Sequence, residues 1–133
     1  MTESSDRSLT IGPLTRTDFV RFAGAGGDFN PLHHDDTYAR AQGYPSVFAM
    51  GMLTASLGSR LLTDWFGLAA LRSYQVRFME PVWPNQTLLI TGRVTRHEDR
   101  ETECVACVDL TIAGDHGDIK MTATACCAVP RPQ

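Results

Sequence analysis

The hydrophobic pattern of this chain changes its period after residue 66, from the spacing of helices to that of strands. Apolar residues from Phe48 to Phe66 recur as they do on one long helix. Later residues alternate between apolar and polar, as strands with one buried face do, in runs at about 71–79, 87–97, 102–112 and 118–129. Helices followed by consecutive strands predict an α+β fold, with an antiparallel sheet packed on the long helix.

Small residues mark one side of the expected long helix. Gly51, Ala55 and Ser59 recur every four positions, and Gly58 lies beside them. Such a stripe allows another backbone to approach the helix closely.

The length and charge of the chain limit its class. Its 133 residues, 43% hydrophobic and 20% charged, fit one domain over residues 1–133, with residues 1–7 expected to be flexible. A net charge of −3 argues against nucleic acid as a partner. The polar N-terminus lacks a signal-peptide core, and no apolar run reaches the roughly 20 residues that cross a bilayer. We therefore expect a cytoplasmic protein without membrane insertion.

The cysteines and glycines do not match a metal or nucleotide motif. Cys104 and Cys107 lie three positions apart in an expected strand and so point to opposite faces, and Cys126 and Cys127 are adjacent in another. The glycine-rich segment 24–27 lacks the preceding strand and the lysine of a phosphate loop. We expect free thiols, no bound metal and no cofactor.

The segment from Gly27 to Asp36 places Asp28 and His33 five positions apart across an Asn-Pro step. On a continuous helix, five residues turn about 140° from the starting face, so the two side chains would diverge. Pro31 breaks the helix, because the residue before a proline leaves the α region and proline suits only a first helical turn. Asp28 on a loop and His33 in the next turn can then hold one water molecule. The adjacent His34 diverges from His33, so a metal site is not expected.

Helix signals flank this segment. Residues Thr15 to Asp18 are typical of a helix N-terminus, and that helix is expected to end at the glycine-rich residues 24–27. A second helix is expected from Pro31 to about Ala41, with Asn30 as its cap and two aspartates serving its first turns.

Three motifs, in order along the chain, carry a family resemblance. They are GDFNPLH from Gly27 to His33, MGML from Met50 to Leu53, and VRFMEPVWP from Val76 to Pro84. Over nearly its whole length the chain resembles the MaoC-like family of (R)-specific enoyl-thioester hydratases and dehydratases. The resemblance implies a single hotdog fold, in which a curved antiparallel sheet wraps a long central helix, and a dimer joined through sheet edges.

The resemblance also implies roles for individual residues. The matched positions are the catalytic Asp28 and His33, the orienting Asn30, the oxyanion donor Gly51 and a serine beside the aspartate, Ser59. Asp28 would accept a proton from water as its oxygen bonds to C3, while His33 holds the same water and helps return a proton to C2. The Gly51 N–H at the start of the long helix would stabilise the enolate oxygen.

Each of these residues also has an ordinary structural explanation, and the chain departs from the family pattern twice. A lone aspartate or histidine is more often a cap or a satisfied surface group, but in this motif we favour catalysis. Asn30 could cap a helix, Gly51 could serve close packing, and Ser59 could bond a helix carbonyl group. Met50 stands where many relatives have a histidine near the thioester carbonyl. Residues 85–86 are Asn-Gln where relatives often have Gly-Asp, and because asparagine tolerates a left-handed turn we expect this change to be structural.

The implied function is that of a hydro-lyase, of the enoyl-CoA hydratase or 3-hydroxyacyl-thioester dehydratase type, in fatty-acid or related acyl metabolism. Its substrate would be an acyl-CoA or acyl carrier protein thioester, and its assembly a homodimer or a heterodimer with a related hotdog chain. The carrier, the acyl chain length, a sterol-like acyl group and the direction of the reaction stay open.

Two alternatives remain. Hotdog acyl-thioesterases more often place a carboxylate on the long helix, which here has its first acid at Asp64. Noncatalytic subunits of heterodimeric hydratases tend to have lost the aspartate and histidine that this chain keeps.

Overall fold

The four expected strands form one antiparallel sheet, and an additional strand from the N-terminal segment extends it. The computed structural model describes residues 6–131. The strands are β1 (Asp6–Leu14), β2 (Leu71–Phe78), β3 (Gln86–Asp99), β4 (Cys104–Ala113) and β5 (Ile119–Val129). Their order in the sheet is β1-β3-β4-β5-β2, and every neighbouring pair is antiparallel. The edges of the sheet are therefore β1 and β2.

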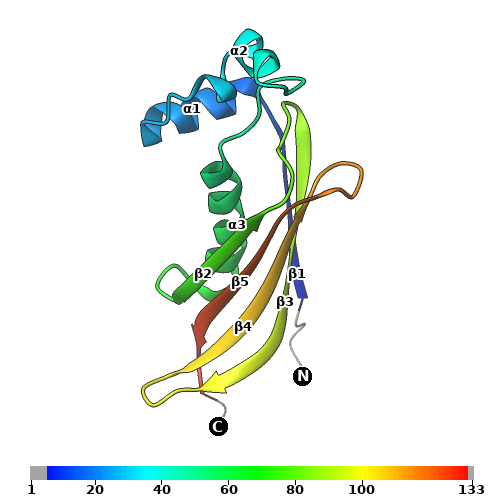
Figure 1. The fold of residues 1–133 in the computed structure, drawn as a ribbon. Helices are drawn as coiled ribbons and strands as arrows, with labels where there is room; N and C mark the ends of the chain where they lie inside the picture. The colour runs from blue at the N-terminus through cyan, green and yellow to red at the C-terminus, as the bar shows by residue number, and fades with distance from the viewer. Residues whose placement is uncertain (1–5, 132–133) are drawn as a thin grey trace.

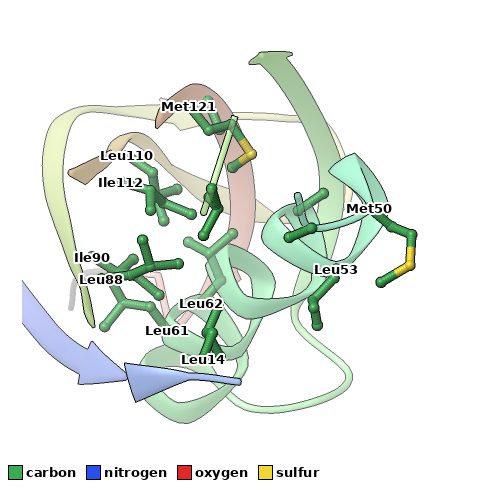
Figure 2. Packing of buried hydrophobic residues seen from close by; sticks show 14 of the residues in the cluster. Leu14, Met50, Leu53, Leu61, Leu62, Leu88, Ile90, Leu110, Ile112 and Met121 are labelled. Carbon is green, nitrogen blue, oxygen red and sulfur yellow. The ribbon is translucent and has the colours of Figure 1, made fainter. Parts of the chain in front are cut away.

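The sheet curves around helix α3 (Gly51–Phe66), as Figure 1 shows. Alternation along β3 buries Leu88 and Ile90 completely and leaves Leu89 44% exposed. Side chains from the sheet and from α3 meet in one core (Figure 2); they include Leu61, Leu62, Leu88, Ile90, Leu110, Ile112 and Met121. A curved sheet around a central helix is the hotdog arrangement expected above.

Glycines on both sides bring α3 close to the sheet. A Cβ added to Gly58 would lie 2.5 Å from the hydroxyl of Tyr74. That hydroxyl donates a hydrogen bond to the Ala55 carbonyl oxygen at 2.7 Å, and burial raises the pKa of Tyr74 to about 12, so it stays a neutral donor. On β3, a Cβ at Gly92 would lie 3.1 Å from both Leu61 and Trp65. The stripe was expected to admit another backbone, but at Gly58 the close neighbours are side chains of the sheet, those of Tyr74, Met121 and Ile112.

The single helix expected over residues 31–41 is wrong, because the chain forms two shorter elements there. Pro31–His33 make one 3₁₀ turn, and α2 spans Asp36–Ala41. Asn30 caps the turn as expected, whereas the side chain of Asp35 caps α2 by accepting a hydrogen bond from the Tyr38 N–H at 3.1 Å. An N-cap residue has extended backbone angles, so a second cap at position 35 ends the first element and begins another.

Helix α1 (Arg16–Gly26) begins at the expected cap, where Thr15 and Asp18 form a reciprocal capping box. It continues through Gly26 and ends at Gly27, whose φ of 72° is left-handed. An ion pair of 3.1 Å between Arg16 and Asp36 joins α1 to α2. Both helices lie at the end of the molecule where α3 begins (Figure 1).

Two boundaries differ from expectation, and one expected turn is confirmed. The long helix begins at Gly51 rather than at residue 48, because Met50 is not helical, with ψ at 135°. Asp6 and Arg7 pair with β3, so the expected flexibility is wrong for these two residues; residues 1–5 lie outside the described part. Asn85 has a φ of 68°, the left-handed turn expected there.

Within residues 6–131, no helix combines the length and the apolar character needed to cross a membrane.

Candidate active site

His33 is held by a main-chain carbonyl group and an aromatic ring. Its Nδ1 lies 2.8 Å from the carbonyl oxygen of Phe48, and the two rings meet edge to face with centroids 5.3 Å apart. A carbonyl oxygen can only accept a hydrogen bond, so Nδ1 carries the proton. When this imidazole is neutral, its Nε2 is therefore unprotonated and can accept a proton.

Asp28 lies opposite that nitrogen. Its Oδ2 is 3.8 Å from His33 Nε2, which is too far for a direct hydrogen bond. Two atoms at this separation can share one water molecule at about 2.8 Å from each. The side chain of His33 is 11% exposed and that of Asp28 is 45% exposed, so the pair opens to solvent on the aspartate side. The structure thus brings together the two residues whose convergence the Asn-Pro step suggested.

Asn30 shapes the loop between these two residues. Its main-chain N–H donates to Asp28 Oδ1 at 3.3 Å, and its own Oδ1 accepts a hydrogen bond from the Leu32 N–H at 3.0 Å. The first contact orients the carboxylate, and the second starts the turn that carries His33. Within residues 6–131 the side chain of Asn30 forms no hydrogen bond with Asp28 or His33, so it acts on the pair through the backbone.

The start of α3 follows Phe48 by three residues and supplies the candidate oxyanion donor. The N–H groups of Leu53 and Thr54 both reach the Met50 carbonyl oxygen, at 3.0 and 3.4 Å, but the Gly51 N–H has no acceptor in the described part of the chain. A free N–H at a helix N-terminus suits an oxygen that becomes negative. The ring of Phe78 also covers Gly51, and an added Cβ would lie 3.1 Å from it. Close packing therefore favours glycine here, and the free N–H makes this residue the candidate oxyanion donor.

A pocket of about 230 Å³ opens beside Gly51. Its wall is mostly apolar and includes Phe48 and Phe78, but two buried polar residues, Thr54 and Lys120, also line it. A larger hollow of about 430 Å³ over β1, β3 and β4 contains none of the candidate site residues. The pocket beside Gly51 adjoins the candidate site through Gly51 and Phe48, and neither Asp28 nor His33 lines it.

Ser59 is not brought to the pair by any hydrogen bond. Its hydroxyl donates to the Ser56 carbonyl oxygen at 2.7 Å, and in residues 6–131 it bonds neither Asp28 nor His33. The structure thus shows the ordinary helix-carbonyl contact for this residue. Asp64 lies two residues before the end of α3, 61% exposed and 3.8 Å from Arg60, so α3 offers the site no carboxylate.

Asp36 fixes the segment that leads to Phe48, a contact that the sequence did not reveal. Its Oδ1 accepts a hydrogen bond from the Val47 N–H at 3.1 Å, and Arg16 pairs with its other oxygen. The Val47 hydrogen bond, with a smaller contribution from Arg16, holds the pKa of Asp36 below its usual value. A sequence pattern indicates that such an aspartate serves a helix end, but not that it binds a residue eleven positions away.

The cysteines remain thiols away from the candidate pair. Cys107 of β4 lies beside Cys126 of β5, with sulfur atoms 3.7 Å apart, a neighbour that spacing within one strand does not reveal. Burial raises the pKa of Cys107, and separately that of Cys127, to about 11. No group of three or more metal-ligating side chains occurs among the described residues.

The chain matches the family described as MaoC like domain over residues 3–114. The 3-oxo-4,17-pregnadiene-20-carboxyl-CoA hydratase beta subunit of Mycobacterium tuberculosis is 35% identical over 101 residues, which cover 75% of this chain and 78% of that protein. Two longer curated relatives are 33% and 38% identical, and the chain spans only 8% and 24% of their lengths.

Solved structures share the whole fold. The (R)-hydratase from A. caviae involved in PHA biosynthesis aligns with a TM-score of 0.84 at 26% identity, over 98% of each chain. A chain of the ChsH1-ChsH2 complex from Mycobacterium tuberculosis aligns with a TM-score of 0.83 at 27% identity, over 98% of this chain and 100% of that one. These likenesses confirm the fold expected from the sequence.

Proposed function

The chain belongs to the MaoC-like family, and on this premise we propose that it is a hydro-lyase acting on 2-enoyl or 3-hydroxyacyl thioesters. One observation carries the proposal: Asp28 Oδ2 lies 3.8 Å from His33 Nε2, while His33 Nδ1 is bound to the Phe48 carbonyl oxygen. A carboxylate and an imidazole lone pair that face one point can hold a water molecule and take its proton.

In the hydration direction the water oxygen forms a bond to C3 of the enoyl group. The C2–C3 double bond opens toward the thioester carbonyl, and one O–H bond of the water breaks. Asp28 accepts that proton, with His33 holding the same water, and the pair delivers one proton to C2. Because water and proton reach the substrate from the same pair, both add to one face. The dehydration direction reverses each step.

The thioester oxygen becomes negative as the double bond opens. The free Gly51 N–H, at the positive end of α3, is the group proposed to stabilise it. Removal of one donor of this kind typically lowers the rate by about a hundredfold or more. Hydration forms a C3–O bond and a C2–H bond, breaks one O–H bond of water and turns the C2–C3 double bond into a single bond. No electrons are gained or lost overall, so the proposed reaction requires neither a metal nor a redox cofactor.

The proposed substrate is an acyl group carried by coenzyme A or acyl carrier protein. The pocket of about 230 Å³ beside Gly51 is smaller than the roughly 300–1,000 Å³ of sites that enclose a drug-sized ligand. The smaller volume accommodates a short part of the thioester, so the rest of the molecule would extend outside this pocket.

The proposed assembly is a dimer, with an identical chain or with a related hotdog chain. Among residues 6–131, no further strand pairs with the outer side of the edge strands β1 and β2, and other chains can pair with such a side unless it is covered. Large apolar side chains that adjoin the site are exposed: Phe29 by 69%, Met52 by 65% and Phe78 by 51%. A second chain would cover such surface. One aligned structure is a complex of two differently named chains, which supports the heterodimer as an alternative to the homodimer.

A panel of trans-2-enoyl-CoA substrates of different lengths tests the proposed reaction. Loss of the enoyl absorbance with formation of the (R)-3-hydroxyacyl product, unchanged by a chelator, is the expected result. Cleavage of the thioester with release of free thiol and no hydration would instead support a hotdog thioesterase. No reaction with any substrate would favour a noncatalytic subunit of a heterodimeric hydratase.

A further inference from the structure

The only lysine of the sequence, Lys120, is buried. It lies at the second position of β5 and is 2% exposed. Its ammonium donates a hydrogen bond to the Pro81 carbonyl oxygen at 2.9 Å and lies 2.5 Å from Asp118 Oδ2. Lysine is rarely buried unless it is paired, and here one of its two contacts is to the main chain of another segment.

Lys120 holds the segment of residues 79–82 from two sides. Its main-chain carbonyl oxygen accepts hydrogen bonds from the Met79 N–H at 2.9 Å and the Glu80 N–H at 3.3 Å. Its side chain holds Pro81 at the other end of this segment. The segment follows β2 directly, so these bonds continue the attachment of that strand to β5 after the regular pairing ends.

The same segment holds the backbone that orients His33. The Val82 carbonyl oxygen accepts a hydrogen bond from the Ala49 N–H at 2.9 Å. Ala49 follows Phe48, whose carbonyl oxygen binds His33 Nδ1 at 2.8 Å, and precedes the start of α3 by two residues. Movement of residues 79–82 would therefore move both the acceptor of His33 and the Gly51 N–H.

We propose that Lys120 is a positioning residue, which fixes the orientation of His33 and the place of the Gly51 N–H through the hydrogen-bonded segments 79–82 and 48–49. The proposal rests on the proposed function for its kinetic consequence, but not for the structural link itself. A shift of about 1 Å in a reacting group can lower the rate by about a hundredfold, so loss of the buried hydrogen bond at Pro81 should slow the reaction.

Asp118 makes this use of a buried lysine possible. Its side chain is 38% exposed, and the neighbouring ammonium is the main cause that holds its pKa below the usual value. The pair brings little net charge to the pocket beside Gly51, which Lys120 also lines. The ammonium therefore serves as a hydrogen-bond donor to Pro81 more than as a binding site for an anion.

The test compares Lys120→Met, which keeps an unbranched apolar chain as long as the carbon chain of lysine but loses the ammonium donor, with Val108→Ala, a core change in β4 away from this link. Nitrogen-15 NMR of the histidine rings reports the tautomer of His33 directly, with the other three histidines as internal references. Wild type and Val108→Ala are expected to show His33 protonated on Nδ1 alone. Lys120→Met is expected to show a mixture of tautomers, with turnover lowered about tenfold or more and KM changed less.

A folded Lys120→Met variant with the wild-type His33 tautomer would overturn the proposal, whatever its activity. Lower turnover with an unchanged tautomer would show that Lys120 acts by another route. The tautomer is read without substrate, so the link can be tested even if the protein proves not to be a hydratase.

Two further measurements apply if Lys120→Met does not fold. Lys120→Gln keeps a donor that ends about one bond short of Pro81 and should show a smaller change in tautomer. In the wild type, the Ala49 and Met79 amides should exchange with solvent through one common opening. An Ala49 amide that exchanges much faster than that of Met79 would contradict the link.

Discussion

Replacement of Asp28 and His33, singly and together, measures whether they act on one water molecule as a unit. Asp28→Asn keeps the shape of the side chain and removes its charge and basicity. His33→Ala removes the imidazole and with it the contact to the Phe48 carbonyl oxygen. The double variant then shows whether the two losses combine.

The expected loss follows from the proposed role and the exposure of Asp28. Asp28 is the group proposed to accept the proton of the water, and general acid–base catalysis by a positioned side chain typically contributes roughly 10²–10⁴-fold in rate. Asp28 is 45% exposed, so solvent can take part of this role and we expect the lower end of that range, about 2.7 kcal/mol. Since 1.36 kcal/mol is a factor of ten in rate, Asp28→Asn should lower turnover by about a hundredfold.

The two single variants and the double variant should have similar turnover. Independent contributions of about a hundredfold each would multiply to about ten-thousandfold, whereas residues that act as a unit give little further loss. The assay is enoyl-CoA hydration at saturating substrate, with the free energy of unfolding measured in parallel and expected to change little. His34→Ala is the matched control, because His34 is exposed, adjacent, and bound through its main chain to Pro31. Near-normal hydration by Asp28→Asn together with an inactive His34→Ala would refute the assignment of the site.

Asn30→Ala should cost about 1 kcal/mol of stability, because its side chain caps the turn at residues 31–33, and should also lower turnover because that turn carries His33; denaturant unfolding and kinetics on the same sample check both. The Val47 N–H holds the pKa of Asp36 down, so the stabilisation is present above the unfolded-state pKa and is lost as the pH falls through the folded value. Below about pH 5, the free energy of unfolding should therefore fall less steeply with decreasing pH for Asp36→Asn than for wild type, and equal slopes would contradict this. Light scattering at micromolar concentration should show a dimer; an active monomer would exclude the proposed assembly, and an inactive one would point to a related partner chain.

The sheet and the central helix could be predicted because their side chains repeat with a regular period. The alternation in β3 predicts which side chains are buried, and the glycine at position 58 predicts a close contact of the helix. The failure at residues 31–41 has a different origin. Asn30 and Asp35 are both good caps, and the choice between one helix and two depends on Val47 and Tyr38, which bind the neighbouring aspartates.

The contacts that orient His33 could not be predicted, because their acceptors are main-chain carbonyl groups at Phe48 and Val82. Every residue has such a group, so no residue type marks them. Lys120 stands out in the sequence as the single lysine of the chain, and its neighbour Met121 is fully buried. Alternation along a strand predicts that such a neighbour is exposed, and the segment 79–82 buries it instead.

Met50 makes the oxyanion position depend on this same backbone. Its side chain is 1% exposed and gives α3 no capping hydrogen bond, so it cannot place a polar group beside the thioester as a histidine there would. In the proposed mechanism the Gly51 N–H therefore supplies the stabilisation from the main chain, next to the hydrogen bond of the Ala49 N–H to the Val82 carbonyl oxygen. A change that shifts residues 79–82 therefore disturbs the orientation of His33 and the oxyanion donor together. A change confined to Asp28 affects only the proton transfer. The two kinds of variant should therefore differ in how much their dehydration rate changes when the C2–H bond of the 3-hydroxyacyl thioester is made more acidic.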